Sequence, residues 1–489
     1  MWVRQCELDA NVEERPPIPM RIASNEEFVP PPQSDEQKQV ELRLWALAER
    51  AATRLNMSRR DFLRTGCGMA AAMLALNQVY GPYYEVQADE LEDMGKVRER
   101  WPKEQFIFDV QTHHVDVNKN WYNDTPDGKK FAEFFKLIRI EGDLDDSLNR
   151  LNLDHYVKEI FFDSDTVMAV ISGVPTREWN KNPLPPDQMA ATRDHVNRLA
   201  GSERVLAHGL VRPNLGSSEL DEMERQVKVL GIRAWKMYTG AEIGEEAWWM
   251  DDEKVAYPCW EKTKALGIKN CCVHKGLPLG LFNEEHCRPK DLVKAARDWP
   301  DLNFIVYHSA FVGFGGDAKW MKEGDPQYIP WTSDLLKDLK ANPNIKNIYF
   351  ELGSTFNQLS AFAPEKCLHM LGQMIQVSGA DHILWGTDSI WGGSPQSQIE
   401  RLRRLKMTDE LRDKFGYSDL TPEIKNQIFG LNAAKLFELD PNAQRKAIEH
   451  DRFSQLRKEY DRNPSPTNTQ YGWIWVEDGS EPTTPIGPG

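Results

Sequence analysis

The sequence is organised by a rhythm in which a short apolar run is followed, again and again, by a segment with helical spacing. Eight such runs occupy residues 106–112, 166–172, 205–212, 232–238, 269–274, 303–308, 347–352 and 382–388. Helical spacing between them is clearest at 189–199, 218–230, 289–299 and 331–339. Repeated strand-then-helix units predict an α/β fold, a (β/α)8 TIM barrel. A doubly wound open sheet is the alternative, but no glycine-rich dinucleotide fingerprint follows the first run.

The first run ends in a polar stretch that we interpret as the start of a functional surface. Side chains alternate between the two faces of a strand, so Asp109, Gln111 and His113 share one face. Gln111 and His113 could reach one metal ion, and Asp109 could orient a neighbour by hydrogen bonding. His114 points to the opposite face unless the chain turns at the strand end. A strand that simply ends in a polar loop is the plain alternative.

Polar residues also close the later runs, at the edge where barrel enzymes keep their active sites. They are Lys236, His274, His308, Glu351 and Asp388. One such residue could be chance. Five are hard to attribute to packing, because a buried charge is costly unless it is paired or bound to a metal. The pattern therefore predicts an active site at the open end of the barrel.

This arrangement resembles the amidohydrolase superfamily, and within it the amidohydrolase-2 branch, which contains hydrolases and decarboxylases related to aminocarboxymuconate-semialdehyde decarboxylase. The branch has Asp-x-His-x-His on strand 1, His on strands 5 and 6, Asp on strand 8, and a closing helix Gly-x-Asn-Ala-x-x-Leu-Phe, which residues 430–437 reproduce. The resemblance covers roughly 104–440. It implies three metal ligands, which are His113, His274 and Asp388. It also implies a non-ligand acid/base at His308 and places Lys236 at the strand-4 edge of the site.

One position departs from the branch pattern. Gln111 stands where the branch has its first histidine ligand, and a neutral amide oxygen is a weaker zinc donor than an imidazole. Three interpretations stay open: Gln111 is a weak fourth ligand, it binds substrate, or the site has lost its metal. The cofactor implied by the resemblance is one divalent metal ion, zinc first and manganese as the alternative.

These parts predict a metal-dependent hydrolase that acts on a small carbonyl or carboxylate compound. A bound ion lowers the pKa of its water to about 7 in favourable sites. Asp388 could take the proton of that water while His308 protonates the leaving group. The same residues fit a metal-dependent non-oxidative decarboxylase, and a binding barrel that has lost catalysis is the other alternative. The expected substrate-binding residues are Lys236, Glu351 and His114.

Three parts of the chain are expected: an N-terminal extension (1–88), the barrel domain (89–440), and a C-terminal helix and arm (441–489). Within them the sequence predicts a substrate loop or lid at 114–153, one charged helix at 441–462, and an irregular arm at 463–489 that wraps the domain or a neighbouring subunit. A formal charge of -15 argues against nucleic acid as a partner. The expected partners are a small-molecule substrate and, by analogy with the branch, a second copy in a homodimer.

The N-terminal extension contains a pattern typical of export. Residues 58–65 read Ser-Arg-Arg-Asp-Phe-Leu-Arg-Thr and resemble the twin-arginine signal. The apolar run that follows at 66–76 is shorter than the about 20 residues that a membrane-spanning helix needs. Val-Gln-Ala at 86–88 resembles a cleavage site. We therefore expect a periplasmic protein cut near residue 88, without a membrane span. The alternatives are a surface helix that happens to contain Arg-Arg, and a start at Met20 or Met57.

Overall fold

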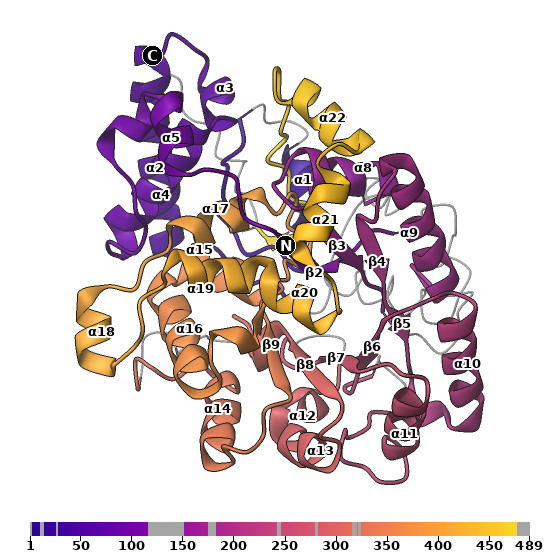
Figure 1. The fold of residues 1–489 in the computed structure, drawn as a ribbon. Coiled ribbons are helices and arrows are strands. Elements are labelled where there is room, and N and C mark those ends of the chain that lie inside the picture. The colour runs from indigo at the N-terminus through magenta and orange to yellow at the C-terminus, as the bar shows by residue number, and fades with distance from the viewer. Residues whose placement is uncertain are drawn as a thin grey trace.

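Parallel strands form the centre of the molecule (Figure 1). The computed structural model describes residues 2–9, 14–25, 28–115, 151–174, 182–241, 246–278, 282–314, 320 and 324–476. Six strands pair in the order β10-β9-β8-β7-β6-β5 and three in the order β2-β3-β4. Their bounds are β2 (Phe108–Thr112), β3 (Met168–Ile171), β4 (Val205–Ala207), β5 (Gly209–Leu210), β6 (Ala234–Tyr238), β7 (Asn270–His274), β8 (Asn303–Tyr307), β9 (Ile348–Glu351) and β10 (Ile383–Leu384).

Hydrogen bonds join the two sheets into one ring. Only His208 separates β4 from β5, so these are two halves of one strand, which pairs with β3 on one side and with β6 on the other. At the opposite seam, the segment after β10 runs parallel to β2. Asp388 N donates to Gln111 O at 2.9 Å, and a parallel bridge joins Thr112 to Ser389. The eight predicted strands and the α/β barrel are therefore confirmed.

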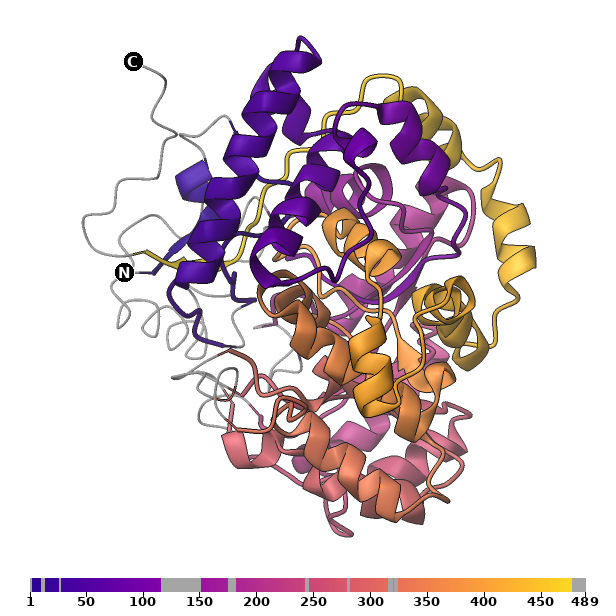
Figure 2. The same cartoon turned by 90° about the vertical axis from the view of Figure 1, so that its left-hand side faces the viewer.

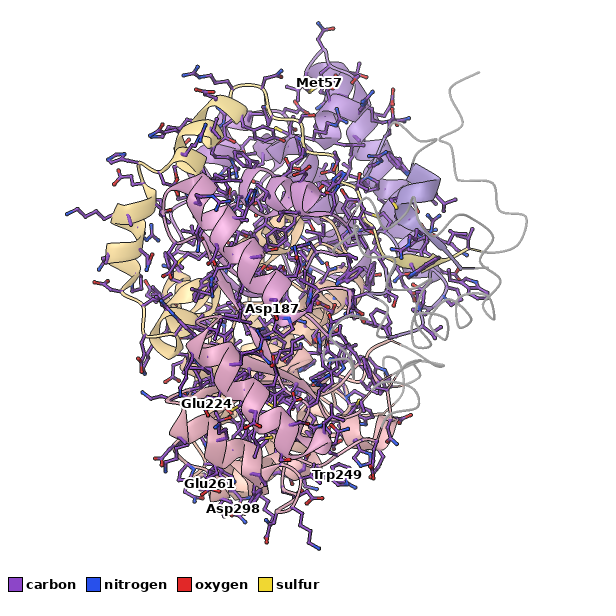
Figure 3. All side chains as sticks on the ribbon, turned by 90° about the vertical axis from the view of Figure 1, so that its right-hand side faces the viewer. Met57, Asp187, Glu224, Trp249, Glu261 and Asp298 are labelled. Atoms are coloured by element: carbon purple, nitrogen blue, oxygen red, sulfur yellow. The ribbon has the colours of Figure 1, made fainter. Side chains whose placement is uncertain are left out.

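Helices cover the outside of the ring, where they follow the strands and, except for the last, carry the chain back to the next strand. They include α9 (Pro186–Ala200), α10 (Ser217–Lys228), α11 (Tyr257–Ala265), α13 (Leu292–Asp298), α14 (Thr332–Ala341), α16 (Pro364–Ser378) and α17 (Gln396–Arg404). Their outer faces carry charge, as Glu224 of α10 and Asp298 of α13 show (Figure 3). Arg225 pairs with Asp187 of α9 at 2.7 Å. Exposed pairs of this kind contribute little to stability, so the fold depends on its interior.

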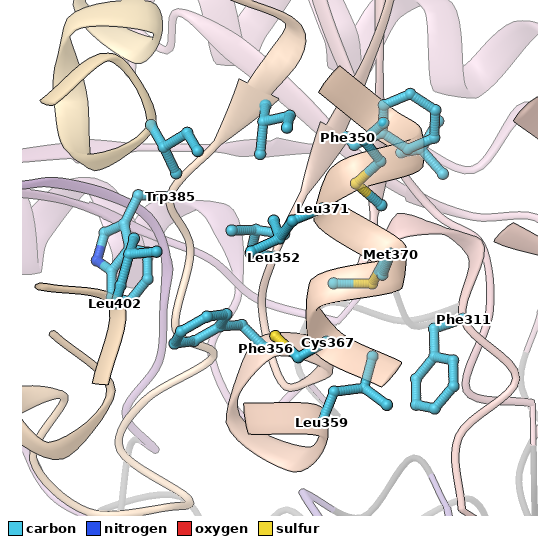
Figure 4. Close-up of a cluster of buried hydrophobic side chains, with 14 of the residues drawn as sticks. Phe311, Phe350, Leu352, Phe356, Leu359, Cys367, Met370, Leu371, Trp385 and Leu402 are labelled. Atoms are coloured by element: carbon cyan, nitrogen blue, oxygen red, sulfur yellow. The ribbon is translucent and has the colours of Figure 1, made fainter. Parts of the chain in front are cut away.

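Apolar side chains fill both the ring and the layer between strands and helices. Inside the ring, neighbouring strands contribute residues such as Phe108, Val170, Leu206, Ile305 and Leu384 to one buried cluster. Figure 4 shows part of the outer layer, where side chains of β9, α16 and α17 meet. Full burial of one such side chain contributes roughly 1.5–3 kcal/mol.

The closing helix predicted at 430–437 seals the end of the barrel away from the site. α20 (Asn432–Leu436) begins with Asn432, whose Nδ2 donates to Ile383 O at 2.8 Å. Gly430 lets this helix approach the first strand, because a Cβ there would lie 2.0 Å from Phe106 O. The close packing at Gly430 and the hydrogen bond of Asn432 thus explain why the motif has glycine and asparagine at these positions.

The N-terminal extension is a layer of helices packed against one side of the barrel (Figure 2). Its helices are α2 (Asp35–Arg54), α3 (Arg59–Leu63), α4 (Gly66–Tyr80) and, just beyond it, α5 (Met94–Arg100). The apolar run at 66–76 lies within α4, where Met73 and Leu76 are buried in the core. Arg59 of the twin-arginine pattern pairs with Glu14 at 2.6 Å and with Glu49 at 3.1 Å. Among the described residues, no helix is both long enough and apolar enough to cross a membrane.

The chain after the barrel returns to the extension. The prediction of one helix over 441–462 is wrong, because two form: α21 (Pro441–Ile448) and α22 (Arg452–Tyr460). Asp451 separates them by capping the second, with its side chain accepting from Ser454 N at 2.8 Å. The arm then forms β11 (Trp473–Trp475), which pairs antiparallel with β1 (Trp2–Arg4). Most of the predicted lid at 114–153 lies outside the described residues.

Candidate active site

The open end of the barrel gathers the side chains that the sequence singled out, since parallel strands bring their carboxyl ends to one edge. They are Gln111 in β2, His113 just after it, Lys236 in β6, His274 at the end of β7, His308 directly after β8, Glu351 at the end of β9, and Asp388 after β10. All of them are buried. Buried polar and charged groups need partners, so their contacts decide what the site can do.

Asp388 is the hydrogen-bonding centre of one side of the barrel mouth. Its Oδ1 accepts from Gln111 Nε2 at 2.9 Å and lies 3.0 Å from His113 Nε2. Its Oδ2 accepts from Asn25 Nδ2 and from Ser354 Oγ, both at 2.5 Å. Burial alone would raise the pKa of Asp388, but His113 and Ser354 hold it well below its usual range. These five residues, the Asp388 cluster, hold an ionised carboxylate with neighbours on both of its oxygens.

A second carboxyl group, Asp109, ties the strand of Gln111 to the segment of Asp388. Its Oδ1 accepts from Thr387 N at 3.0 Å and from Gln111 N at 3.1 Å, and Thr387 Oγ1 donates to Oδ2. Burial raises the pKa of Asp109 to about 7, although these hydrogen bonds oppose the rise. Asp109 therefore orients its neighbours by hydrogen bonding, as its place on the strand predicts.

The contacts of His113 call for a positive charge beside Asp388. His113 Nδ1 lies 2.8 Å from Ser172 O, which can only accept, so Nδ1 carries hydrogen. Its other nitrogen, Nε2, then faces a carboxylate oxygen at 3.0 Å. Two lone pairs repel each other at that distance. Either a proton on Nε2 or a metal ion bound by both atoms removes this repulsion.

The other side of the mouth is built from rings. His274 stacks on Tyr238, with ring centroids 4.6 Å apart, and the edge-to-face contact of His274 with His308 also has a centroid distance of 4.6 Å. His308 Nδ1 lies 2.9 Å from Gly353 O, so Nδ1 carries hydrogen and Nε2 is the nitrogen able to accept a proton. Burial and then the charge of Lys236 lower the pKa of His274 well below its usual range. Its imidazole is therefore neutral near pH 7.

A strained turn presents His308. His308, Ser309 and Ala310 all have positive φ, at 63°, 52° and 56°. Such a backbone costs non-glycine residues roughly 1–2 kcal/mol each, so contacts must hold it. Glu351 does so, because Oε2 accepts from His308 N at 3.0 Å and Oε1 from Gly353 N at 2.5 Å. Burial raises the pKa of Glu351 well above its usual range, against the effect of these N–H groups.

Lys236 lies inside the barrel beside aromatic rings. Its Nζ is 4.0 Å from the ring centroid of Tyr307 and 4.9 Å from that of Tyr238. After burial, its charge is the next cause of the lowered pKa values of His208 and His274. Lys236 therefore supplies positive potential to the interior of the barrel near the site.

His114 is the predicted site residue that the structure does not bring to the others. It lies on the opposite face of the strand, where Nε2 is 2.9 Å from Thr192 Oγ1 and the ring packs against Tyr156. Its side chain thus supports α9 rather than the barrel mouth, because the alternation of the strand continues one residue past β2.

Sequence reasoning missed three residues of the site: Asn25, Ser354 and Tyr238. Tyr238 ends a predicted strand and Ser354 follows one by two residues, so a survey of all polar residues at strand ends includes them. Asn25 is different, because 363 positions separate it from Asp388 and no pattern around it signals a site.

A divalent ion fits one face of the Asp388 cluster. Gln111 Nε2, His113 Nε2 and Asp388 Oδ1 form a triangle with edges of 2.9, 3.0 and 3.4 Å. Ligand atoms about 2.0–2.2 Å from an ion stand roughly 3 Å apart, so the triangle has the size of such a face. The third corner belongs to an amide. In the described ranges no three His, Cys, Asp or Glu side chains form a metal-binding group, so the structure does not gather the predicted ligands His113, His274 and Asp388 into one.

A rotation of the Gln111 side-chain amide by about 180° would place its oxygen, and not its nitrogen, in the triangle with His113 Nε2 and Asp388 Oδ1. Its Oε1 is buried and finds no hydrogen-bond partner among the described residues. A Cβ on Gly353 would lie 2.3 Å from this oxygen and 2.6 Å from Glu351 Oε1, so the Gln111 amide oxygen and the Glu351 carboxyl group share one small space. Turning the amide would direct N–H toward Glu351 and oxygen toward His113 and Asp388. The residues present therefore fit a weakly held ion.

A cavity of about 600 Å³ opens away from this site. It lies between the extension, α17 and the C-terminal residues 457–470, and Met69, Trp101 and Tyr460 are among its lining residues. No predicted site residue lines it. The cavity and the candidate site are therefore separate features of the molecule.

Comparison with known proteins identifies one family. Residues 181–439, just over half of the chain, match the family described as Amidohydrolase. This range contains β6 to β10, with His274, His308 and Asp388. The curated proteins contain no match to the chain.

Several solved structures are similar at low identity. One is 2,6-dihydroxybenzoate decarboxylase from Rhizobium, with 14% identity over 68% of this chain and 99% of that chain and a TM-score of 0.39. Another is 5-carboxyvanillate decarboxylase from Sphingomonas paucimobilis, with 14% identity over 69% and 100% and a TM-score of 0.41. A third is 4-oxalomesaconate hydratase from Rhodopseudomonas palustris, with 18% identity over 70% and 98% and a TM-score of 0.41. All three TM-scores are below 0.5, so the barrel rests on the hydrogen bonds of this chain.

Proposed function

This chain belongs to the amidohydrolase family, and from that membership we propose that it is an enzyme that acts on a small carbonyl or carboxylate compound at the open end of its barrel. The observation that supports this best is the Asp388 cluster, in which a buried, ionised carboxylate is held by protein donors. Enzymes keep such perturbed groups where they orient substrate or move protons.

We propose hydrolysis as the reaction, with His308 as the proton-transfer residue. As the oxygen of an attacking water bonds to the substrate carbonyl carbon, its proton passes to His308 Nε2. When the C–O or C–N bond breaks, the same proton passes to the leaving group. Asp388 is a poor proton acceptor, because its pKa is depressed and both of its oxygens accept hydrogen bonds. We therefore assign to Asp388 the holding and orienting of its neighbours.

One divalent ion is the cofactor that we propose. His113, Asp388 and the turned amide of Gln111 would hold it, and the family resemblance adds His274 as a further donor. When bound, it would polarise the substrate carbonyl and lower the pKa of bound water to about 7. Zinc and manganese both accept nitrogen and oxygen donors of this kind.

Decarboxylation is the second candidate reaction, and Lys236 is the observation that favours it. Its ammonium group is buried beside the rings of Tyr307 and Tyr238. A buried cation beside aromatic faces suits an aromatic carboxylate as substrate. Its carboxylate would lie against the ammonium group of Lys236, and its ring would pack among the tyrosines. In that reaction the C–C bond to the carboxylate breaks, carbon dioxide leaves, and His308 delivers a proton to the carbon that remains.

Elemental analysis joined to two assays tests these proposals. The full-length chain is stripped with a chelator, reloaded with Zn²⁺ or Mn²⁺, and assayed for hydrolysis of 4-nitrophenyl acetate and for carbon dioxide release from 2-hydroxybenzoate. We expect about one ion per chain, lost together with activity in His274→Ala and Asp388→Ala. His114→Ala is the matched control, because it removes a buried histidine outside the site. Full activity in metal-free protein would reject the metal-dependent mechanism.

We also propose export by the twin-arginine route to the periplasm and assembly as a homodimer, on the basis of residues 58–65 and of the family resemblance. Fractionation of a Gram-negative host tests the first, and Arg59→Lys combined with Arg60→Lys is expected to hold the protein in the cytoplasm. Sedimentation of the purified chain tests the second.

A further inference from the structure

We infer that the N-terminal extension is a working part of the active site, and that its Asn25 is a positioning residue for Asp388. This inference rests on the proposed function at that site. It also bears on the expected cleavage near residue 88, because a chain cut there would lack Asn25.

The segment of Asn25 is fastened to the C-terminal arm. Ser24 and Trp473 exchange two backbone hydrogen bonds, at 2.7 and 3.1 Å. The arm in turn is bonded to the loop just beyond Asp388, since Gly472 N donates to Trp391 O at 2.7 Å. The approach is tight enough to need glycine, because a Cβ at position 472 would lie 2.4 Å from Ser24 O. Asn25 is thus placed by backbone pairing and is itself buried.

The rest of the extension is held to the barrel by polar and apolar contacts. Within the extension, Glu85 N donates to Arg404 O of α17 at 2.9 Å, and directly after it Glu90 forms a fully buried ion pair with the same arginine. Tyr84 donates to Ser360 O. Apolar residues of α3 and α4 are part of the same core cluster as the barrel helices. Removing the extension would expose this apolar surface and take away the hydrogen bonds of Tyr84 and Glu85 to the barrel, so we expect it to stay.

The Asn25 amide fixes the plane of the Asp388 carboxylate. Asn25 Nδ2 and Ser354 Oγ reach Oδ2 from two different segments, while Gln111 and His113 face Oδ1. With both oxygens engaged, the carboxylate cannot rotate, and Oδ1 stays aimed at the two residues proposed to share an ion with it. An amide does this without adding charge, so its contribution is orientation.

The test uses the full-length chain and two readouts that need no substrate. The variants are Asn25→Ala, Ser354→Ala and the double variant, and Gln33→Ala is the control, because Gln33 bonds to Met20 O and Glu41 within the same extension. Hydrogen exchange measured by mass spectrometry follows the peptide that contains residues 385–391, and titration calorimetry follows Mn²⁺ binding.

We expect Asn25→Ala and Ser354→Ala each to speed exchange in that peptide at least tenfold and to weaken Mn²⁺ binding about tenfold. In the double variant the fold-change in each readout should be smaller than the product of the two single fold-changes. Gln33→Ala should match the wild type in both readouts. Unchanged exchange in Asn25→Ala would overturn the inference. If the wild type binds no Mn²⁺ and the exchange result stands, the proposed metal fails while the role of Asn25 holds.

Intact mass gives the second test. Protein recovered from the periplasm and from the cytoplasm of an expressing host is weighed, and we expect both to retain residue 25. A mature chain that begins near residue 89, binds Mn²⁺ like the full chain and exchanges no faster at 385–391 would overturn the inference.

Discussion

Two buried carboxyl groups at the barrel mouth, Asp388 and Glu351, differ in what surrounds them. Asp388 faces side chains on both oxygens, one of them an imidazole, and its pKa is depressed. Among the described residues Glu351 accepts from two backbone N–H groups, and full burial raises its pKa. The number and charge of the donors, and not the depth of burial, decide which group is ionised. Neighbouring carboxyl groups with opposite shifts are typical of divided roles, here orientation by Asp388 and support of His308 by Glu351.

The largest effect is expected from Asp388→Asn, which removes the charge and keeps the shape. One carboxylate oxygen becomes an NH₂ group, which donates and therefore faces the donors already present. The hydrogen bonds that hold the Asp388 cluster together are then partly lost. We expect activity to fall at least about 1000-fold, as in other sites that lose a central charged group, and Mn²⁺ binding to become undetectable by calorimetry. Retention of both would mean that the depressed pKa has no functional consequence.

His308→Gln comes next and tests proton transfer separately from metal binding. Loss of a positioned acid/base typically costs about 100- to 10,000-fold in rate. The proposed ligands are untouched, so Mn²⁺ affinity should stay within about threefold of the wild type. Steady-state kinetics and calorimetry on the same preparation measure both. A parallel loss of affinity would place His308 among the ligands instead.

Glu351→Gln sharpens the comparison through pH. Because the folded state holds a proton on Glu351 above its ordinary pKa of 4.5, the unfolded state binds fewer protons, and the stability of the wild type falls as pH rises above about 4.5. Gln cannot titrate, so this part of the slope should vanish. At pH 5 the variant should be less stable by about 1 kcal/mol, from poorer pairing with the backbone N–H of His308 or Gly353. Urea unfolding from pH 5 to 8 measures both effects, and parallel curves would contradict the raised pKa.

The smallest effect is expected on the side of the mouth that is built from rings. Tyr238→Leu removes the stack on His274 but keeps an apolar side chain. Stacked pairs contribute about 0.5–1.5 kcal/mol beyond their buried area, so unfolding should become easier by about that amount and Mn²⁺ binding should weaken only a few-fold. Phe at the same position is the matched control, since it restores the ring. A loss as large as that of Asp388→Asn would remove the distinction between the two sides.

The repeating strand-and-helix units of the barrel could be predicted from the sequence alone. Each strand of the ring is a local apolar run, and the position of His274, His308 and Asp388 at the ends of such runs follows from parallel pairing alone. Gly430 and Asn432 could likewise be read from a short motif.

Contacts between distant segments could not be read in this way. Asn25 reaches Asp388 only because Ser24 pairs with the arm, and no local periodicity encodes that pairing. The apolar run at 66–76 has the composition of a signal core, but its burial depends on which surface of the barrel is available to it. The break between α21 and α22 depends on Asp451, whose carboxylate also pairs with Arg204 at 2.7 Å.

The pairing of β1 with β11 has a consequence for biosynthesis. Arg4 donates to Tyr471 O across 467 positions, so β1 has no pairing partner until β11 has been synthesised. Until then Asn25 lacks the backbone pairing of Ser24 with Trp473 that holds it beside Asp388. A chain that stops short of Trp473 would therefore lack the contacts that place Asn25 beside Asp388.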